Sequence, residues 1–178
     1  MRKSVLMPIL SIFLAAAILL GAYNLLGSFR QSRMEAELTA KMQTILPGSE
    51  TFAEETYTGE DANIRKVYKG ETGYVVLTQT SGYAGSITML IGVSSEGTVT
   101  GLQVRDMSET PGLGGEALTD WEFLAQFLNT TGDAEVGKTV DALTGATVTS
   151  RAIARSVNSA VGFVTGADAS SGATSWGG

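Results

Sequence analysis

The N-terminal part of the chain contains 26 consecutive uncharged residues between Lys3 and Arg30. The stretch from Val5 to Leu26 is almost wholly Leu, Ile, Ala, Val and Met. At ~1.5 Å per residue, a helix over this stretch spans roughly 33 Å, which exceeds a hydrocarbon thickness of about 30 Å. We therefore expect residues 1–29 to form a short cytoplasmic stub and a single transmembrane helix.

A cleaved signal peptide is the alternative interpretation, because Arg2 and Lys3 resemble the charged start of such a peptide. The length of the apolar run and the lack of a small-residue cleavage pattern favour an anchor. Basic residues lie on both sides of the run, so charge gives only a weak guide to orientation. The chain from Arg30 onward carries all 18 acidic and ten of the twelve basic residues, a net charge of −8. We expect this part outside the cytoplasm, at the cell (inner) membrane.

The composition excludes several classes of function. The net charge of −6 disfavours an electrostatic grip on nucleic acid, so we expect no nucleic-acid partner. The chain has no cysteine and no histidine, which excludes disulfides, Cys-ligated clusters, His-ligated zinc and Ser-His-Asp catalysis. We therefore expect no metal site and no catalytic side chain, and any redox chemistry must come from a bound cofactor.

Beyond the anchor, the pattern predicts a stalk helix over 30–48, a folded domain over 49–165 and a disordered Ser/Gly/Ala tail over 166–178. Turn residues separate short runs rich in β-branched and aromatic residues, which predicts an antiparallel sheet. A helix capped by Asp120 follows from Trp121 to about Leu128, with Trp121, Leu124 and Leu128 on one stripe and the two phenylalanines beside it. A second helix is expected from about Thr149 to Val164. The fold class is α+β, with predicted strands Ile64–Lys69, Tyr74–Thr80, Ser86–Val93 and Val99–Val104.

The most informative segment is Asp141-Ala142-Leu143-Thr144-Gly145-Ala146-Thr147, directly before the second helix. Small residues let a backbone approach a ligand closely, and the free amides at a helix start favour phosphate. A plain loop with Thr147 or Thr149 as the helix cap produces the same pattern.

Residues 141–147 resemble the flavin-attachment motif of the FMN-binding domain shared by the G subunit of Rnf electron-transport complexes and the C subunit of sodium-pumping NADH:quinone reductases. Two further segments resemble family motifs in the same order along the chain. They are the loop Glu109-Thr110-Pro111-Gly112-Leu113-Gly114-Gly115 and the strand start Gly82-Tyr83-Ala84-Gly85-Ser86-Ile87. The short single-pass chain is more similar to the Rnf protein than to the longer quinone-reductase one.

The resemblance implies that Thr147 carries FMN through a phosphoester bond, installed by a dedicated flavin transferase that uses FAD. It also implies that further residues contact the cofactor: Thr144, Gly145, Ala146, Glu109, Thr110, Leu113 and Gly114. Lys138, Glu109 and Asp141 are charges that could tune the flavin, but surface ion pairs are the simpler explanation and the favoured one. The tail segment ending at Thr174 repeats the motif spacing without a following helix, so we expect one flavin, on Thr147.

The function implied is a membrane-anchored subunit that relays electrons within an Rnf-type ion-translocating ferredoxin:NAD oxidoreductase complex. Its expected partners are the other membrane and cluster-bearing subunits, the flavin transferase and membrane lipid. A stand-alone membrane-anchored flavoprotein that reduces an external acceptor is a second hypothesis, and a binding module without flavin is a third.

Overall fold

The computed structural model describes residues 19, 32–107 and 120–167 of the chain. The chain divides into two compact units, Met1–Ala40 and Lys41–Gly178. Among the described residues, no helix is both long enough and apolar enough to cross a membrane. The apolar run that we expect to form the anchor lies almost entirely outside the described residues, as does the tail beyond residue 167.

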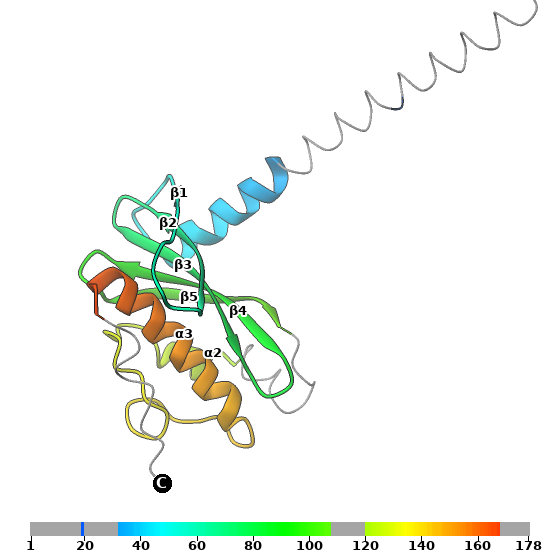
Figure 1. The fold of residues 1–178 in the computed structure, drawn as a ribbon, viewed down its shortest axis with the longest axis vertical. Coiled ribbons are helices and arrows are strands. Elements are labelled where there is room, and N and C mark those ends of the chain that lie inside the picture. Colours follow the sequence, from blue (N-terminus) through cyan, green and yellow to red (C-terminus); the bar gives the residue numbers. More distant parts are fainter. Residues whose placement is uncertain (1–18, 20–31, 108–119, 168–178) are drawn as a thin grey trace, which may run out of the picture. The chain divides into compact units, whose positions relative to one another are not determined.

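Five strands form one antiparallel sheet in sequence order: β1 (Ala53–Glu55), β2 (Ile64–Lys69), β3 (Gly73–Ser81), β4 (Ser86–Ser94) and β5 (Val99–Met107) (Figure 1). Each strand therefore pairs with its sequence neighbour through a short connection. The expected α+β class and antiparallel sheet are confirmed. Four strands match the predicted ranges closely, and the pattern did not indicate the three-residue edge strand β1, which is exposed throughout.

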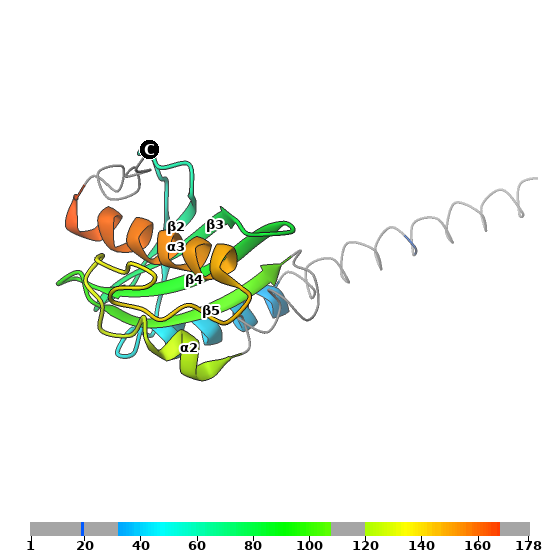
Figure 2. The ribbon, with the colours of Figure 1, turned by 90° about the horizontal axis from the view of Figure 1, so that it is seen from below.

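A 19-residue helix, α3 (Thr147–Thr165), lies across one side of the sheet (Figure 2). Ile153, Val157 and Val161 are fully buried on its inner face, and they share one core cluster with alternate residues of β4. The helix begins at Thr147, two residues before the predicted start. It ends where Gly166 adopts a left-handed φ of 67°, which glycine tolerates at a helix C-terminus.

The opposite side of the sheet contacts the end of the helical segment 32–45, where Met42, Ile45 and Leu46 are buried. Gly92 and Gly101 form a cross-strand pair beside Ile45. A Cβ at Gly101 would lie 2.7 Å from the Ile45 Cα, so only glycine allows this close approach. Helical backbone over 32–45 agrees with the expected stalk helix, whose predicted range begins at residue 30.

The helix predicted from Trp121 to Leu128 is shorter in the structure, where α2 covers Trp121–Ala125. Phe123 N–H donates to Asp120 Oδ1 at 3.1 Å, so the predicted cap is confirmed. After Ala125 the chain tightens into turns, because Phe127 N–H bonds Leu124 O at 3.2 Å. The predicted stripe is also wrong: Trp121 is 69% exposed, whereas Phe123 and Phe127 are buried with ring centroids 5.4 Å apart.

Candidate functional site

The direction of α3 over the sheet determines which loops meet. Near the start of α3, Thr80 Oγ1 donates to Ala152 O at 3.1 Å and shares a hydrogen bond with Ser156 Oγ at 2.9 Å. At the other end, a Cβ on Gly97 would collide with Thr165. The helix therefore runs from the β3–β4 hairpin toward the β4–β5 turn, and its first residue lies at the hairpin end of the sheet (Figure 1).

The hairpin end contains the motif segment Gly82–Ile87. Gly82 N–H bonds Gly85 O at 2.7 Å and closes the turn, and the Tyr83 ring at its tip is 67% exposed. Arg155 of α3 donates to Ser81 O at 3.0 Å and ties the base of the hairpin to the helix. Sequence reasoning did not select Tyr83 as a site residue, although it stands in the quoted hairpin motif.

β5 ends at the same end of the sheet, because Met107, its last residue, pairs with Ile87 at the start of β4. The motif segment Glu109–Gly115 follows in the sequence. Glu109, Thr110, Leu113 and Gly114 themselves lie outside the described residues.

The segment before α3 is held at both of its ends. Asp141 N–H donates to Gln126 Oε1 at 2.8 Å, and Leu143 N–H donates to Ser150 Oγ at 3.2 Å. Ala146 N–H bonds Leu143 O at 3.0 Å around Gly145, whose φ is 78°. A positive φ at the third position is the requirement of a type II turn. Thr144 and Gly145 form the exposed tip of that turn, and Ala146 is buried.

The helix start that follows has no side-chain cap. Ala146 is the N-cap residue and makes no side-chain hydrogen bond, so the cap that the plain-loop alternative assigns to Thr147 or Thr149 is not present. The first intrahelical bond runs from Ser150 N–H to Ala146 O at 2.9 Å, which leaves three earlier amides, those of Thr147, Val148 and Thr149, for another acceptor. Thr147 is exposed, while Thr149 is fully buried and its hydroxyl has no partner.

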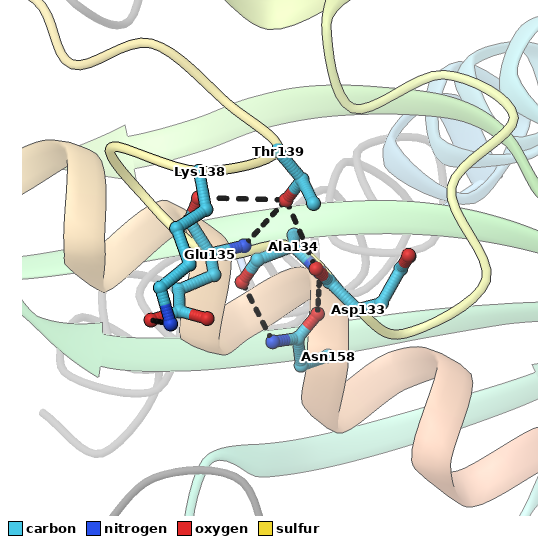
Figure 3. Close-up of polar contacts among 6 residues, drawn as sticks. All are labelled: Asp133, Ala134, Glu135, Lys138, Thr139 and Asn158. Atoms are coloured by element: carbon cyan, nitrogen blue, oxygen red, sulfur yellow. Dashed lines mark hydrogen bonds and ion pairs between the residues drawn. The ribbon is translucent and has the colours of Figure 1, made fainter. Parts of the chain in front are cut away.

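The chain just ahead of this segment is anchored on α3 by a network of polar contacts (Figure 3). The Asn158 amide exchanges two 3.0 Å hydrogen bonds with the Ala134 backbone. The Thr139 hydroxyl accepts from Glu135 N–H at 2.8 Å and donates to Asp133 O at 2.9 Å. Lys138 Nζ lies 2.8 Å from Glu135 Oε1 on the surface. This surface ion pair accounts for Lys138 without a role in tuning the flavin.

A cavity of about 330 Å³ lies at the other end of α3. It is bordered by the loop from Glu55 to Asp61 and by Ser159, Phe163 and Gly166 of the helix region. Of the predicted flavin residues that the structure describes, Thr144, Gly145, Ala146 and Thr147, none lines it. Ser159 is 12 residues from Thr147, about 18 Å along the helix axis, so this cavity is separate from the attachment segment.

The pKa shifts that the structure produces fall outside the attachment segment. Burial raises the pKa of the Tyr68 hydroxyl, and the hydrogen bond with Glu54 raises the pKa of Lys66. Both residues belong to β2. The groups at the start of α3 are the exposed Thr147 hydroxyl, the open helix amides and, four residues along, Arg151.

These features define an α+β domain with an exposed hydroxyl and open amides at a helix start, and comparison with known proteins identifies the class. Residues 82–162 match the FMN-binding domain family. The match spans both the hairpin motif and Thr147.

Full-length relatives identify the particular family. The G subunit of the ion-translocating oxidoreductase complex of Methanosarcina acetivorans is 40% identical over 139 residues, covering 69% of this chain and 72% of the relative. That of Pseudomonas aeruginosa is 32% identical, covering 91% and 89%. The G subunit of the Na(+)-translocating ferredoxin:NAD(+) oxidoreductase complex of Acetobacterium woodii is 29% identical, covering 90% and 89%. This chain belongs to the family of G subunits of ion-translocating oxidoreductase complexes, which confirms the resemblance found in its sequence.

Proposed function

We propose that this chain is the flavin-carrying subunit of an Rnf-type ion-translocating ferredoxin:NAD oxidoreductase complex, with one FMN joined covalently to Thr147. The observation that carries the proposal is the position of Thr147. Its side chain is exposed at the first residue of α3, next to open amides and directly after a turn of small residues. FMN supplies the capacity to accept and pass on electrons, which the side chains of this chain lack.

Thr147 serves as the tether in this proposal. During maturation its hydroxyl oxygen bonds to the FMN phosphorus of FAD while the bond to AMP breaks, so AMP leaves and the hydroxyl loses its proton. The product is a phosphodiester with one negative charge. The amides of the first turn of α3 offset that charge, because the N-terminus of a helix carries a partial positive charge.

The neighbouring segments hold the flavin ring. Thr144, Gly145 and Ala146 have small side chains, so the phosphate and ribityl chain approach the backbone closely. Glu109, Thr110, Leu113 and Gly114, which the family resemblance assigns to the cofactor, complete the proposed set of flavin contacts. The exposed Tyr83 offers an aromatic face at the same end of the sheet.

The membrane arrangement completes the proposal. Residues 1–29 provide the cytoplasmic stub and a single transmembrane helix, 30–48 the stalk, 49–165 the FMN-binding domain and 166–178 the tail. The domain lies on the extracytoplasmic side, where a covalent bond keeps the cofactor from being diluted. Its partners are the other membrane and cluster-bearing subunits, the flavin transferase and membrane lipid.

Intact-mass measurement after coexpression with a flavin transferase tests the attachment. Wild type should gain the mass of one FMN, Thr147→Ser should retain some adduct and Thr147→Ala should show none. Thr174→Ala is the matched control, since it removes a threonine with the same motif spacing, and it should leave the adduct unchanged. A yellow, FMN-bearing Thr147→Ala chain after denaturation would overturn the proposal.

Two further experiments test the setting of the domain. A reporter that is active only outside the cytoplasm, fused after Val164, should be active. Purification of the full chain from native membranes should bring other membrane subunits and a cluster-bearing subunit with it. A chain that carries flavin but purifies alone would support the stand-alone flavoprotein.

A further inference from the structure

The charges on α3 are unusual for a surface helix. Its sequence contains two arginines, Arg151 and Arg155, and no acidic residue. The two arginines stand four residues apart, where like charges repel each other. Arg151 also follows directly after the first turn of the helix, whose partial positive charge disfavours cations. The helix therefore carries a local excess of positive charge that its own residues do not balance.

The two arginines differ in their contacts. Arg155 donates to Ser81 O at 3.0 Å and secures the hairpin. Arg151 is exposed, and no carboxylate in the described ranges forms an ion pair with it. Its guanidinium group thus has five donors and no described acceptor. Structural need explains Arg155 and leaves Arg151 without an explanation.

The position of Arg151 relative to Thr147 offers an explanation for Arg151. The two residues are four apart on α3, so their side chains are neighbours on the same exposed face. Side chains on a helix lean toward its N-terminus. The Arg151 side chain therefore extends over the turn that contains Thr147.

We propose that Arg151 is a positioning residue for the flavin, and that its guanidinium group binds the phosphodiester formed on Thr147. This inference rests on the proposed attachment of FMN. A guanidinium group presents two parallel N–H donors to two phosphate oxygens, which fixes direction as well as distance. Arg151 thereby converts a flexible tether into an oriented one, and the phosphate supplies the anion that α3 lacks.

The test compares full-length chains with and without the flavin. Wild type, Arg151→Gln and Arg151→Lys are each produced with and without the transferase, and the thermal midpoint of unfolding and the ³¹P resonance are measured. Lys138→Gln is the matched control, because it removes the same charge from a residue already paired with Glu135. Midpoints are compared at low and at high salt.

Without flavin, Arg151→Gln should unfold at the same temperature as wild type or slightly higher, since a repulsive charge is removed. With flavin, wild type should gain about 1 to 3 °C more than Arg151→Gln gains, and salt should reduce this difference. The ³¹P resonance should shift in Arg151→Gln, partly return in Arg151→Lys and stay unchanged in Lys138→Gln.

Other outcomes overturn the inference. An equal flavin-induced gain and an unchanged ³¹P resonance in Arg151→Gln would mean that Arg151 does not bind the phosphate. Loss of the adduct in Arg151→Gln alone would assign Arg151 to the attachment reaction instead. If wild type itself gains no FMN, the proposed function fails, and that result is distinct from both.

Discussion

The two ends of the sheet are held in different ways. At one end, which we call the closed end, the 70–73 and 94–98 turns meet the segment 45–51 and the end of α3. Ser49 Oγ accepts from Thr72 N–H at 3.0 Å, and Ser95 N–H donates to Thr72 O at 3.0 Å. Thr100 Oγ1 donates to Ile45 O at 2.7 Å. Backbone and side-chain partners thus meet across three segments that are distant in sequence.

We call the other end the open end. It consists of the 82–85 hairpin, the 141–146 segment and the first turn of α3, and its polar groups are exposed. Tyr83 and Val148 are exposed apolar residues there, and three helix amides are left for another acceptor. The contrast fits the proposed function, in which the closed end supplies stability and the open end holds the flavin. Substitutions at the closed end should change unfolding without changing attachment, and those at the open end should do the reverse.

The largest expected loss of stability comes from Phe127→Ala. Phe127 is fully buried against Phe123, and the nearby Asn129 N–H bonds Val99 O at 2.9 Å beside the closed end. Removing the ring should lower the free energy of unfolding by about 3 to 5 kcal/mol. Urea unfolding measures this loss. The folded fraction should still accept FMN, and a folded chain without adduct would contradict the separation of the two ends.

Gly92→Ala should have the next largest effect. A Cβ at Gly92 would collide with the carbonyl oxygen of Ile45, so the helix end and the sheet must separate. Overpacking of this kind costs about 1 to 3 kcal/mol. Gly137→Ala measures the cost of backbone strain alone, because its φ is 90° and its Cβ would meet nothing within 4 Å; Gly92 has no such strain, so its loss reports the Ile45 contact. An unchanged free energy of unfolding in Gly92→Ala would show that the Ile45 contact contributes nothing.

The same contrast explains how much could be predicted from the sequence. The range Ile64–Lys69 is predicted correctly because its β-branched and aromatic residues end at a turn of glycines. The predicted start of α3 is two residues late, because helix starts are recognised by capping side chains and Ala146 provides none.

Thr147 is selected as the proposed attachment residue through a family resemblance, since the residue types of the 141–147 segment alone are also typical of a plain loop. Its convergence with the hairpin depends on the direction of α3 over the sheet, which involves Thr80 and Ala152, 72 residues apart. Local periodicity carries no information at that distance. Sequence reasoning missed the supports Gln126 and Ser150 for the same reason.

At the open end, Gly145→Ala should reduce FMN attachment more than it reduces stability, the reverse of the closed-end variants. Its φ of 78° is strained for alanine, yet a Cβ there would meet nothing within 4 Å, so the cost is about 1 to 2 kcal/mol of backbone strain. Relief of that strain changes the turn that presents Thr147, so we expect less FMN adduct per folded chain by intact mass. Gly137→Ala carries the same strain outside the turn and should keep full attachment. Full attachment in Gly145→Ala would mean that the turn does not matter.

The smallest expected effect is at the closed end, where Glu71 joins the 70–73 turn to the 50–51 segment. Its carboxylate accepts from Thr51 Oγ1 at 2.7 Å and from Glu50 N–H at 3.0 Å. The hydrogen bond from Thr51 lowers the pKa of Glu71 below its ordinary value of 4.5. A carboxyl group with a lowered pKa in the folded state stabilises the fold above its unfolded pKa. That contribution is lost as pH falls through the folded pKa.

Glu71→Gln should therefore lower the thermal midpoint slightly at pH 7 and make it less sensitive to acid than that of wild type. The difference between the two chains should shrink as the pH falls below 4.5. Glu96→Gln is the matched control, because it removes an exposed carboxylate from the neighbouring β4–β5 turn, and it should follow the wild-type pH profile. A difference that persists unchanged at low pH would show that the Glu71 charge does not hold this end of the sheet, and attachment of FMN should be the same in all three chains.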